Sequence, residues 1–133
     1  MKTRFGRVLV RTLWIATITV LSGRAAVEIA ANEPLTIRVD PPVSYAPADL
    51  RVQLGVMPSA DNSRLVVVAD SAGFYRSSEM PLDAEDAPRT VIVQFRGLPG
   101  GVYTVWGEVT DAGGRRLAVA RREVTILPLA GNQ

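Results

Sequence analysis

From residue 35 onward, apolar residues recur at every second position of short segments, and this period constrains the fold more than any other feature. In residues 35–39 and 50–56, apolar side chains alternate with polar ones, as they do in strands with one buried face. Residues 65–69 are apolar throughout and rich in valine, which is typical of a central strand. The expected strands are residues 35–39, 50–56, 65–69, 74–78, 90–95, 103–110 and 116–127.

Turn residues set the ends of these strands. Pro41 and Pro42 end the first strand, because proline has no N–H to give to a ladder. Residues 111–114 (Asp-Ala-Gly-Gly) predict a hairpin turn with glycines available for positive φ. The last strand changes its alternation near residues 121–123, which predicts a β-bulge there. No helical period follows the N-terminal segment, so the sequence predicts an all-β, two-sheet antiparallel sandwich of about seven strands.

The stretch from Leu98 to Tyr103 (Leu-Pro-Gly-Gly-Val-Tyr) is a turn that delivers a tyrosine to the start of a strand. Leu98, Gly101 three residues later and Tyr103 two further on resemble the tyrosine corner of immunoglobulin-like and fibronectin type III-like sandwiches. The resemblance covers residues 35–127, and Tyr103 alone carries over, as the corner residue. It implies that the tyrosine hydroxyl bonds to the backbone a few residues upstream and fixes the crossover between sheets.

The chain departs from those families in its core. It has no cysteine, and neither of its two tryptophans lies on the second or third expected strand. The disulfide and the tryptophan that usually pack together at the centre of such cores are therefore absent. Residues 74–82 (FYRSSEMPL) are also similar to small exported bacterial proteins of uncharacterised function. That similarity implies export and no particular activity.

The N-terminal residues predict a secretory signal peptide. A positive region precedes the short apolar run 12–21, and Gly23-Arg24-Ala25 offers small residues for cleavage after Ala25. The positive residues are Lys2, Arg4, Arg7 and Arg11. The alternative is an uncleaved membrane anchor, but the apolar run is far shorter than the ~20 residues of a spanning helix. We therefore expect an exported protein, periplasmic or extracellular, with no stable membrane span after cleavage.

The expected organisation is a signal peptide at 1–25, a lead-in at 26–34, the sandwich at 35–127 and a flexible tail at 128–133. Cleavage would leave ten basic and thirteen acidic residues, a net charge of −3, on the mature chain. A chain with this net negative charge does not attract the phosphates of nucleic acid, so we expect no nucleic-acid binding. The chain also has no histidine and no cysteine, the commonest general base and the thiol nucleophile, so we expect no enzyme and no cofactor.

Two charged segments are candidates for chemistry. Asp83, Glu85 and Asp86 place three carboxylates on one loop, which could supply some oxygen ligands to calcium; the alternative is an ordinary solvated loop. The same carboxylates would make a weak hydrolase candidate, because neighbours on one loop do not face each other across a cleft. The last hairpin carries a basic patch of Arg115, Arg116, Arg121 and Arg122. It could bind an acidic polysaccharide or phosphate, or its long side chains could guard a sheet edge.

Trp106 gives the sharpest prediction. If Tyr103 and Val105 point inward, strand alternation sends Trp106 to the outer face, beside Val66 and Val68 of the neighbouring strand. An exposed tryptophan beside β-branched residues can mark a binding surface. The alternatives are a tryptophan half-covered by arginine stems, or a reversed phase that buries it.

These observations predict an exported, non-catalytic module for protein interaction or structural support in the cell envelope. The expected interaction surface consists of Trp106, Val66, Val68 and Tyr75. The alternative is a carbohydrate-binding accessory module that binds a polysaccharide, for which exposed aromatic residues would have to form a platform. The candidate platform residues are Trp106, Tyr75, Phe74 and Tyr45.

Overall fold

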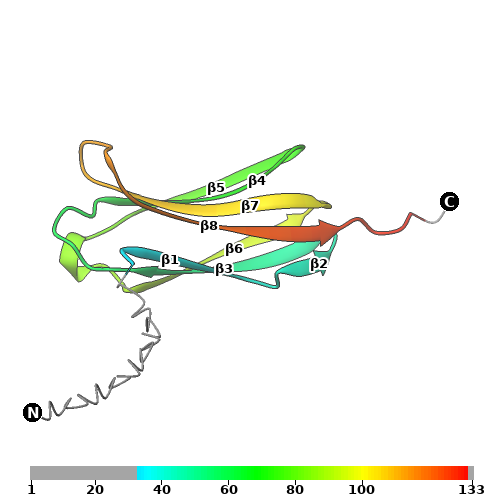
Figure 1. Cartoon of the computed structure of the whole chain (residues 1–133), viewed down its shortest axis with the longest axis horizontal. Coiled ribbons are helices and arrows are strands. Elements are labelled where there is room, and N and C mark those ends of the chain that lie inside the picture. The colour runs from blue at the N-terminus through cyan, green and yellow to red at the C-terminus, as the bar shows by residue number, and fades with distance from the viewer. Residues whose placement is uncertain (1–32, 132–133) are drawn as a thin grey trace, which may run out of the picture.

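The computed structural model describes residues 33–131, which form eight strands and one short 3-10 turn (Figure 1). The strands are β1 (Leu35–Asp40), β2 (Val43–Tyr45), β3 (Ala48–Val56), β4 (Arg64–Ser71), β5 (Phe74–Pro81), β6 (Thr90–Leu98), β7 (Gly101–Thr110) and β8 (Arg116–Leu127). The 3-10 turn, η1 (Ala84–Asp86), lies between β5 and β6. Seven of the eight strands were expected from the sequence, and β2 is the addition.

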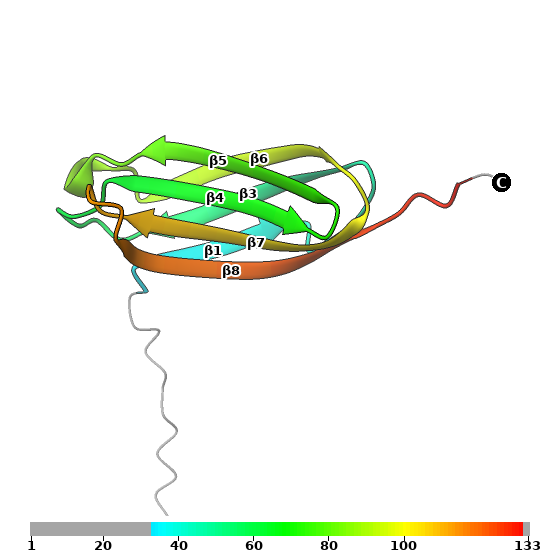
Figure 2. The same ribbon diagram turned by 90° about the horizontal axis from the view of Figure 1, so that it is seen from above.

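The strands form two sheets that lie face to face (Figures 1 and 2). One sheet has three strands in the order β1-β3-β6, and the other has five in the order β2-β8-β7-β4-β5. Every neighbouring pair is antiparallel except β2 and β8, which run parallel. The predicted two-sheet, immunoglobulin-like sandwich is therefore confirmed, and the description as wholly antiparallel is wrong for this one pair.

The strand β2 arises because the chain changes sheets at Pro41 and Pro42. β1 belongs to the three-stranded sheet, and β2 pairs with the end of β8 in the other sheet. The Thr125 N–H donates to the carbonyl of Pro42 at 3.1 Å, which fixes the start of this pairing. A strand of three residues is too short to show an alternation, so the sequence pattern does not reveal it.

The core lies between the sheets and consists of the inward side chains of alternate strand positions. Among its fully buried side chains, the largest are Tyr103, Phe95, Leu50, Leu54, Leu65, Leu98 and Ile126. Gly107 marks a close approach of the two sheets, since a Cβ there would lie 2.5 Å from Leu54 Cδ2. Strands with one face in this core explain the period of two that the sequence shows.

The predicted tyrosine corner is present. Tyr103 is fully buried, and its hydroxyl donates to the carbonyl of Pro99 at 2.8 Å, four residues upstream. Leu98 is also fully buried beside the turn, and the ring of Phe74 meets the Tyr103 ring edge-on with centroids 6.3 Å apart. The hydrogen bond joins the start of β7 to the turn that leaves β6, so it fixes the crossover between the sheets.

We expect Tyr103→Phe to lower the free energy of unfolding by about 1–2 kcal/mol, because the Pro99 carbonyl loses its donor while the ring packing stays. Urea denaturation measures the change. The matched control is Tyr75→Phe, which removes a hydroxyl from a side chain that is 62% exposed and should leave stability unchanged. Equal stabilities of the two variants would show that the corner bond contributes nothing.

The β-bulge lies elsewhere than predicted. The register of β7 and β8 shifts between Val109 and Thr110, whereas the pairing opposite residues 121–123 is regular. The change in alternation comes from Arg122, which takes the inward position opposite Val105 while remaining exposed at the margin of the sheet. A charged residue at an inward position of an edge strand therefore interrupts the alternation of apolar and polar residues, although the strand itself has no bulge there.

The predicted signal peptide at residues 1–25 and most of the lead-in at 26–34 lie outside the described residues, so export and cleavage remain predictions. The described start of the tail, residues 128–131, is exposed and lies beyond the last strand. Within residues 33–131, no helix is long and apolar enough to cross a membrane.

Candidate interaction surface

The outer face of the five-stranded sheet is the candidate interaction surface. Val105 and Val109 of β7 are buried in the core, so the side chain of Trp106 between them points outward. The phase predicted for this strand is therefore confirmed. Trp106 is half-buried rather than freely exposed.

At the centre of this face Trp106 lies opposite Val68 of β4 in the ladder. Val68 is fully buried although it is not part of the core between the sheets, and Val66 is half-buried. The predicted place of Val68 on the outer face beside Trp106 is therefore confirmed, although the residue is buried there, and we attribute its burial to the cover that the indole provides. Tyr75, on the edge strand β5, remains exposed. The role of these residues in binding stays a prediction.

We expect Trp106→Ala to lower the free energy of unfolding by about 2 kcal/mol, because a half-buried indole is lost and Val68 is uncovered. Thermal or urea denaturation measures the loss. The matched variant Trp106→Phe keeps an aromatic cover and should lose less than half as much. If both variants unfold at the wild-type midpoint, the indole does not cover Val68.

One end of the outer face is closed by two ion pairs between neighbouring strands. Arg64 Nε lies 3.0 Å from Glu79 Oε1, and Arg116 Nε lies 3.0 Å from Glu108 Oε2. Three of the four side chains are more than half exposed, so these pairs add little to stability. They make this end of the face polar, and each charged side chain is paired with an opposite charge.

The opposite end is apolar. Val43 and Tyr45 on β2, Val102 on β7 and Leu127 on β8 share the outer face, and they account for four of the eight large hydrophobic residues exposed between residues 33 and 131. Val43 and Val102 are each 57% exposed and flank Thr125 in one row, while Tyr45 is 67% exposed and pairs with Leu127. We call these four residues the apolar end.

The apolar end was not predicted from the sequence, because β2 is too short to show a recognisable pattern. The alternation around Tyr103 already places Val102 outward, which is the one signal that could have indicated this surface. Its two partners on β2 reach the surface only through the crossover at Pro42, a tertiary feature.

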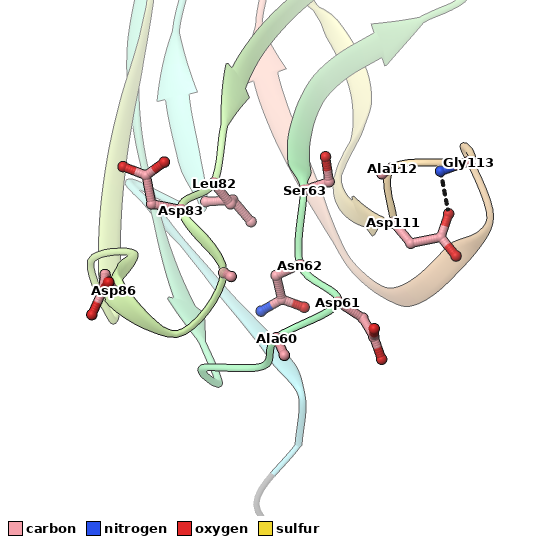
Figure 3. A pocket seen from close by; sticks show the side chains of 11 residues that line it. Ala60, Asp61, Asn62, Ser63, Leu82, Asp83, Asp86, Asp111, Ala112 and Gly113 are labelled. Atoms are coloured by element: carbon pink, nitrogen blue, oxygen red, sulfur yellow. Dashed lines mark hydrogen bonds between the residues drawn. The ribbon is translucent and has the colours of Figure 1, made fainter.

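The loop end of the sandwich holds an open depression of about 710 Å³ between the β3–β4 loop, the η1 loop and the last hairpin (Figure 3). The carboxylates of Asp83, Asp86 and Asp111 at its rim point in different directions (Figure 3). Within residues 33–131, no three acidic side chains converge as ligands of one ion. The structure therefore does not bring Asp83, Glu85 and Asp86 together as a calcium site.

The carboxylate of Asp111 stabilises its own hairpin. Its Oδ1 accepts from the N–H of Gly113 at 2.9 Å and of Arg115 at 2.8 Å, and its Oδ2 lies 3.2 Å from Arg115 Nε. Gly114 takes the positive φ of 83° that the turn requires. The predicted hairpin turn is confirmed, and Asp111 has a structural role in it.

Asn62 is a buried polar residue that the sequence analysis did not single out. Its Nδ2 donates to the Met57 carbonyl at 2.9 Å, and its own carbonyl accepts from the Ala84 N–H at 3.2 Å. These bonds join the β3–β4 loop to η1, so Asn62 orders the loop end rather than offering a reactive group. Its place in the Ser59–Ser63 turn is the signal that could have found it.

The basic patch of the last hairpin divides into two parts. Arg115 and Arg116 form the ion pairs described above, whereas Arg121 and Arg122 form no salt bridge within residues 33–131. β8 is paired on both sides only at its last three residues, so these arginines lie on a sheet edge. Such a position agrees with the alternative of charges that guard an edge.

The aromatic residues do not form the platform that a carbohydrate site needs. Phe74 packs inward against Tyr103, with the Arg76 guanidinium 5.2 Å from its ring centre, so its predicted place on a platform is wrong. Tyr45 and Tyr75 lie on β2 and β5, at opposite edges of the sheet. Four strand spacings separate them, about 19 Å.

No protein-family model matches the chain, and no curated protein matches it in sequence. Three solved structures share its general shape. A superoxide reductase (neelaredoxin) from Ignicoccus hospitalis is 13% identical, with 76% of this chain and 86% of that chain covered and a TM-score of 0.48. The PKD domain of an M14-like peptidase from a Thermoplasmatales archaeon is 15% identical, with 73% of this chain and 99% of that chain covered and a TM-score of 0.49.

A CARDB domain from Pyrococcus furiosus, solved in complex with di-metal ions, is 14% identical, with 71% of this chain and 91% of that chain covered and a TM-score of 0.46. The fold is immunoglobulin-like. The sheet order and the tyrosine corner of this chain carry that conclusion. Likenesses this distant supply no argument about its activity or its ligands.

Proposed function

We propose that this chain is an exported, non-catalytic module that binds another protein of the cell envelope through the outer face of its five-stranded sheet. The observation that carries the proposal is the apolar end, where Val43, Tyr45 and Val102 are each more than half exposed on the same face of the sheet. Contiguous exposed apolar side chains mark interaction sites, because their burial in a complex is favourable.

The remaining parts of the proposal rest on the sequence. The positive N-terminal region, the short apolar run and Gly23-Arg24-Ala25 support export. The lack of histidine and cysteine supports a module without catalytic activity. The half-buried Trp106 lies on the same face as the apolar end, so a partner that covers this end can extend its contact along β7.

The test is a pull-down from an envelope extract with the mature chain, residues 26–133. We expect the double variant Tyr45→Ser, Val102→Asp to retain at least tenfold less of the partner than the wild type, because interface anchors contribute about 2 kcal/mol or more each. Quantitative mass spectrometry of the captured proteins measures the ratio.

The matched control is Ile92→Asp, which places a charge at an exposed apolar position on the outer face of the other sheet. It should capture the partner as well as the wild type does. Equal capture by the apolar-end variant and the wild type would show that the partner binds elsewhere. Loss in the control alone would assign binding to the three-stranded sheet.

A further inference from the structure

β8 has an open edge along most of its length. On one side it pairs with β7 from Arg116 to Ile126, but on the other side β2 pairs only with Thr125–Leu127. Among residues 33–131, no strand therefore lies beside residues 116–124 on the β2 side. Figure 2 shows β8 at the margin of the sandwich, on the same side as β1 of the other sheet.

The direction of the backbone groups along this edge follows from the pairing with β2. The Thr125 N–H faces β2, because it donates to the carbonyl of Pro42. Alternate residues of a strand direct their N–H and C=O groups to the same side, so those of Val119, Arg121 and Glu123 face the open side. This spacing is what an added strand requires.

A groove of about 380 Å³ accompanies the open edge between β1 and β8. Its apolar lining comes from Ile37, Val39, Pro42 and Val124, and Arg122 lies among them. Pro42 closes the groove at the point where β2 begins, so the open edge is the empty continuation of the position that β2 occupies. A side chain of an added strand can enter this groove.

The charges of the edge specify the kind of strand that fits. Arg121 and Arg122 have no salt bridge within residues 33–131, and Glu123 is the one acidic residue beside them on the strand. Antiparallel pairing with the same edge of a second copy, in a register centred on Arg121 or Arg122, would place that arginine opposite its own copy, and opposed like charges destabilise a ladder. An acidic strand gains from both arginines instead.

We propose that residues 116–124 of β8 accept an extended acidic peptide segment of a partner protein as an added strand. The peptide backbone bonds to the N–H groups of Val119, Arg121 and Glu123 and to the carbonyls of Val119 and Glu123, while the Arg121 carbonyl already accepts from Arg122 Nη1 at 3.2 Å. The carboxylates of the peptide lie beside Arg121 and Arg122. This site is separate from the apolar end, and it goes beyond the proposed function because it does not require binding there.

The test uses a fluorescein-labelled synthetic peptide of repeating Glu-Glu-Thr units, with blocked termini and long enough to span residues 116–124. Adjacent glutamates point to opposite faces of a strand, so they can reach both Arg121 and Arg122. Fluorescence anisotropy with the mature chain at 0.15 M salt measures its affinity. We expect saturable binding, and about tenfold or more weaker binding when lysine replaces glutamate. The same acidic peptide with an N-methyl group on every residue keeps its charge but has no N–H to donate along either edge, so its affinity should fall at least tenfold as well.

Two protein variants locate the site. The double variant Arg121→Glu, Arg122→Glu should lower the affinity for the acidic peptide at least tenfold. The control is Arg51→Glu, at an exposed position on the other sheet, and it should change this affinity less than twofold. Amide hydrogen exchange followed by NMR gives a second readout. The peptide should slow exchange at Val119, Arg121 and Glu123, whose N–H groups face the open side.

Four results would overturn the proposal. The acidic peptide could fail to reach saturable binding. The N-methylated peptide could bind as tightly as its parent, which would reduce the effect to attraction of charges. The Arg51 variant could lose as much affinity as the edge variant, or exchange at the three open N–H groups could stay unchanged, which would place the peptide elsewhere on the protein.

Discussion

Val105→Asp prevents this chain from folding: that is the largest effect we expect from a single substitution. Val105 is fully buried in the middle of β7, between the two sheets, and lies opposite Ala69 of β4 and Arg122 of β8. A carboxylate there loses its hydration, and Arg122, which is exposed at the margin of the sheet, can pair with it only by giving up its own hydration. A buried charge whose pairing is incomplete costs about 3–5 kcal/mol, a large share of a typical stability of about 5–15 kcal/mol.

The measurement is far-UV circular dichroism with thermal unfolding, and the same strand provides the control. Val102→Asp makes the identical change three residues away, at a side chain that is 57% exposed on the outer face. It should change the free energy of unfolding by no more than about 0.5 kcal/mol. A cooperative transition for Val105→Asp near the wild-type midpoint would mean that β7 does not face the core as described.

The second largest effect concerns the contact between the sheets at Gly107. A Cβ at this position would lie 2.5 Å from Leu54 Cδ2 and 3.5 Å from Leu35 Cδ2, and both leucines are buried. Neither can move aside without displacing other core side chains. We expect Gly107→Val to lower the free energy of unfolding by about 3 kcal/mol, since overpacking forces the surrounding core out of its preferred rotamers.

Urea denaturation measures this loss, and two further variants identify its cause. Gly73→Val has open space around its Cβ and should be close to neutral. Leu54→Ala creates room opposite Gly107, so the double variant should be more stable than the sum of the two single losses predicts. Strict additivity in this double-mutant cycle would contradict a direct clash between residues 54 and 107.

Local patterns in the sequence were sufficient to predict most of this fold. The alternation of β7 places Val105 inward and Trp106 outward, and the structure has both orientations. The stretch from Leu98 to Tyr103 predicts the corner bond, and the Pro99 carbonyl accepts it. These features follow from neighbours a few residues apart, because strand periodicity and turn chemistry are set by the local backbone.

The candidate surface depended on contacts that no local pattern contains. Val68 alternates as an outer residue, yet it is fully buried, because Trp106 from another strand lies beside it. The exposed side chains of Val43 and Tyr45 belong to a strand that exists only because β8 is next to it.

By itself, the sequence determined seven of the eight strands, most of their inward faces and the tyrosine corner, since each is encoded by residues close together in the chain. The tertiary structure alone decided which outer residues are covered, where the apolar end lies and which edge of β8 stays open. The physical reason is that exposure and edge pairing depend on which strands become neighbours. That choice is made by packing between segments as far apart as Pro42 and Thr125.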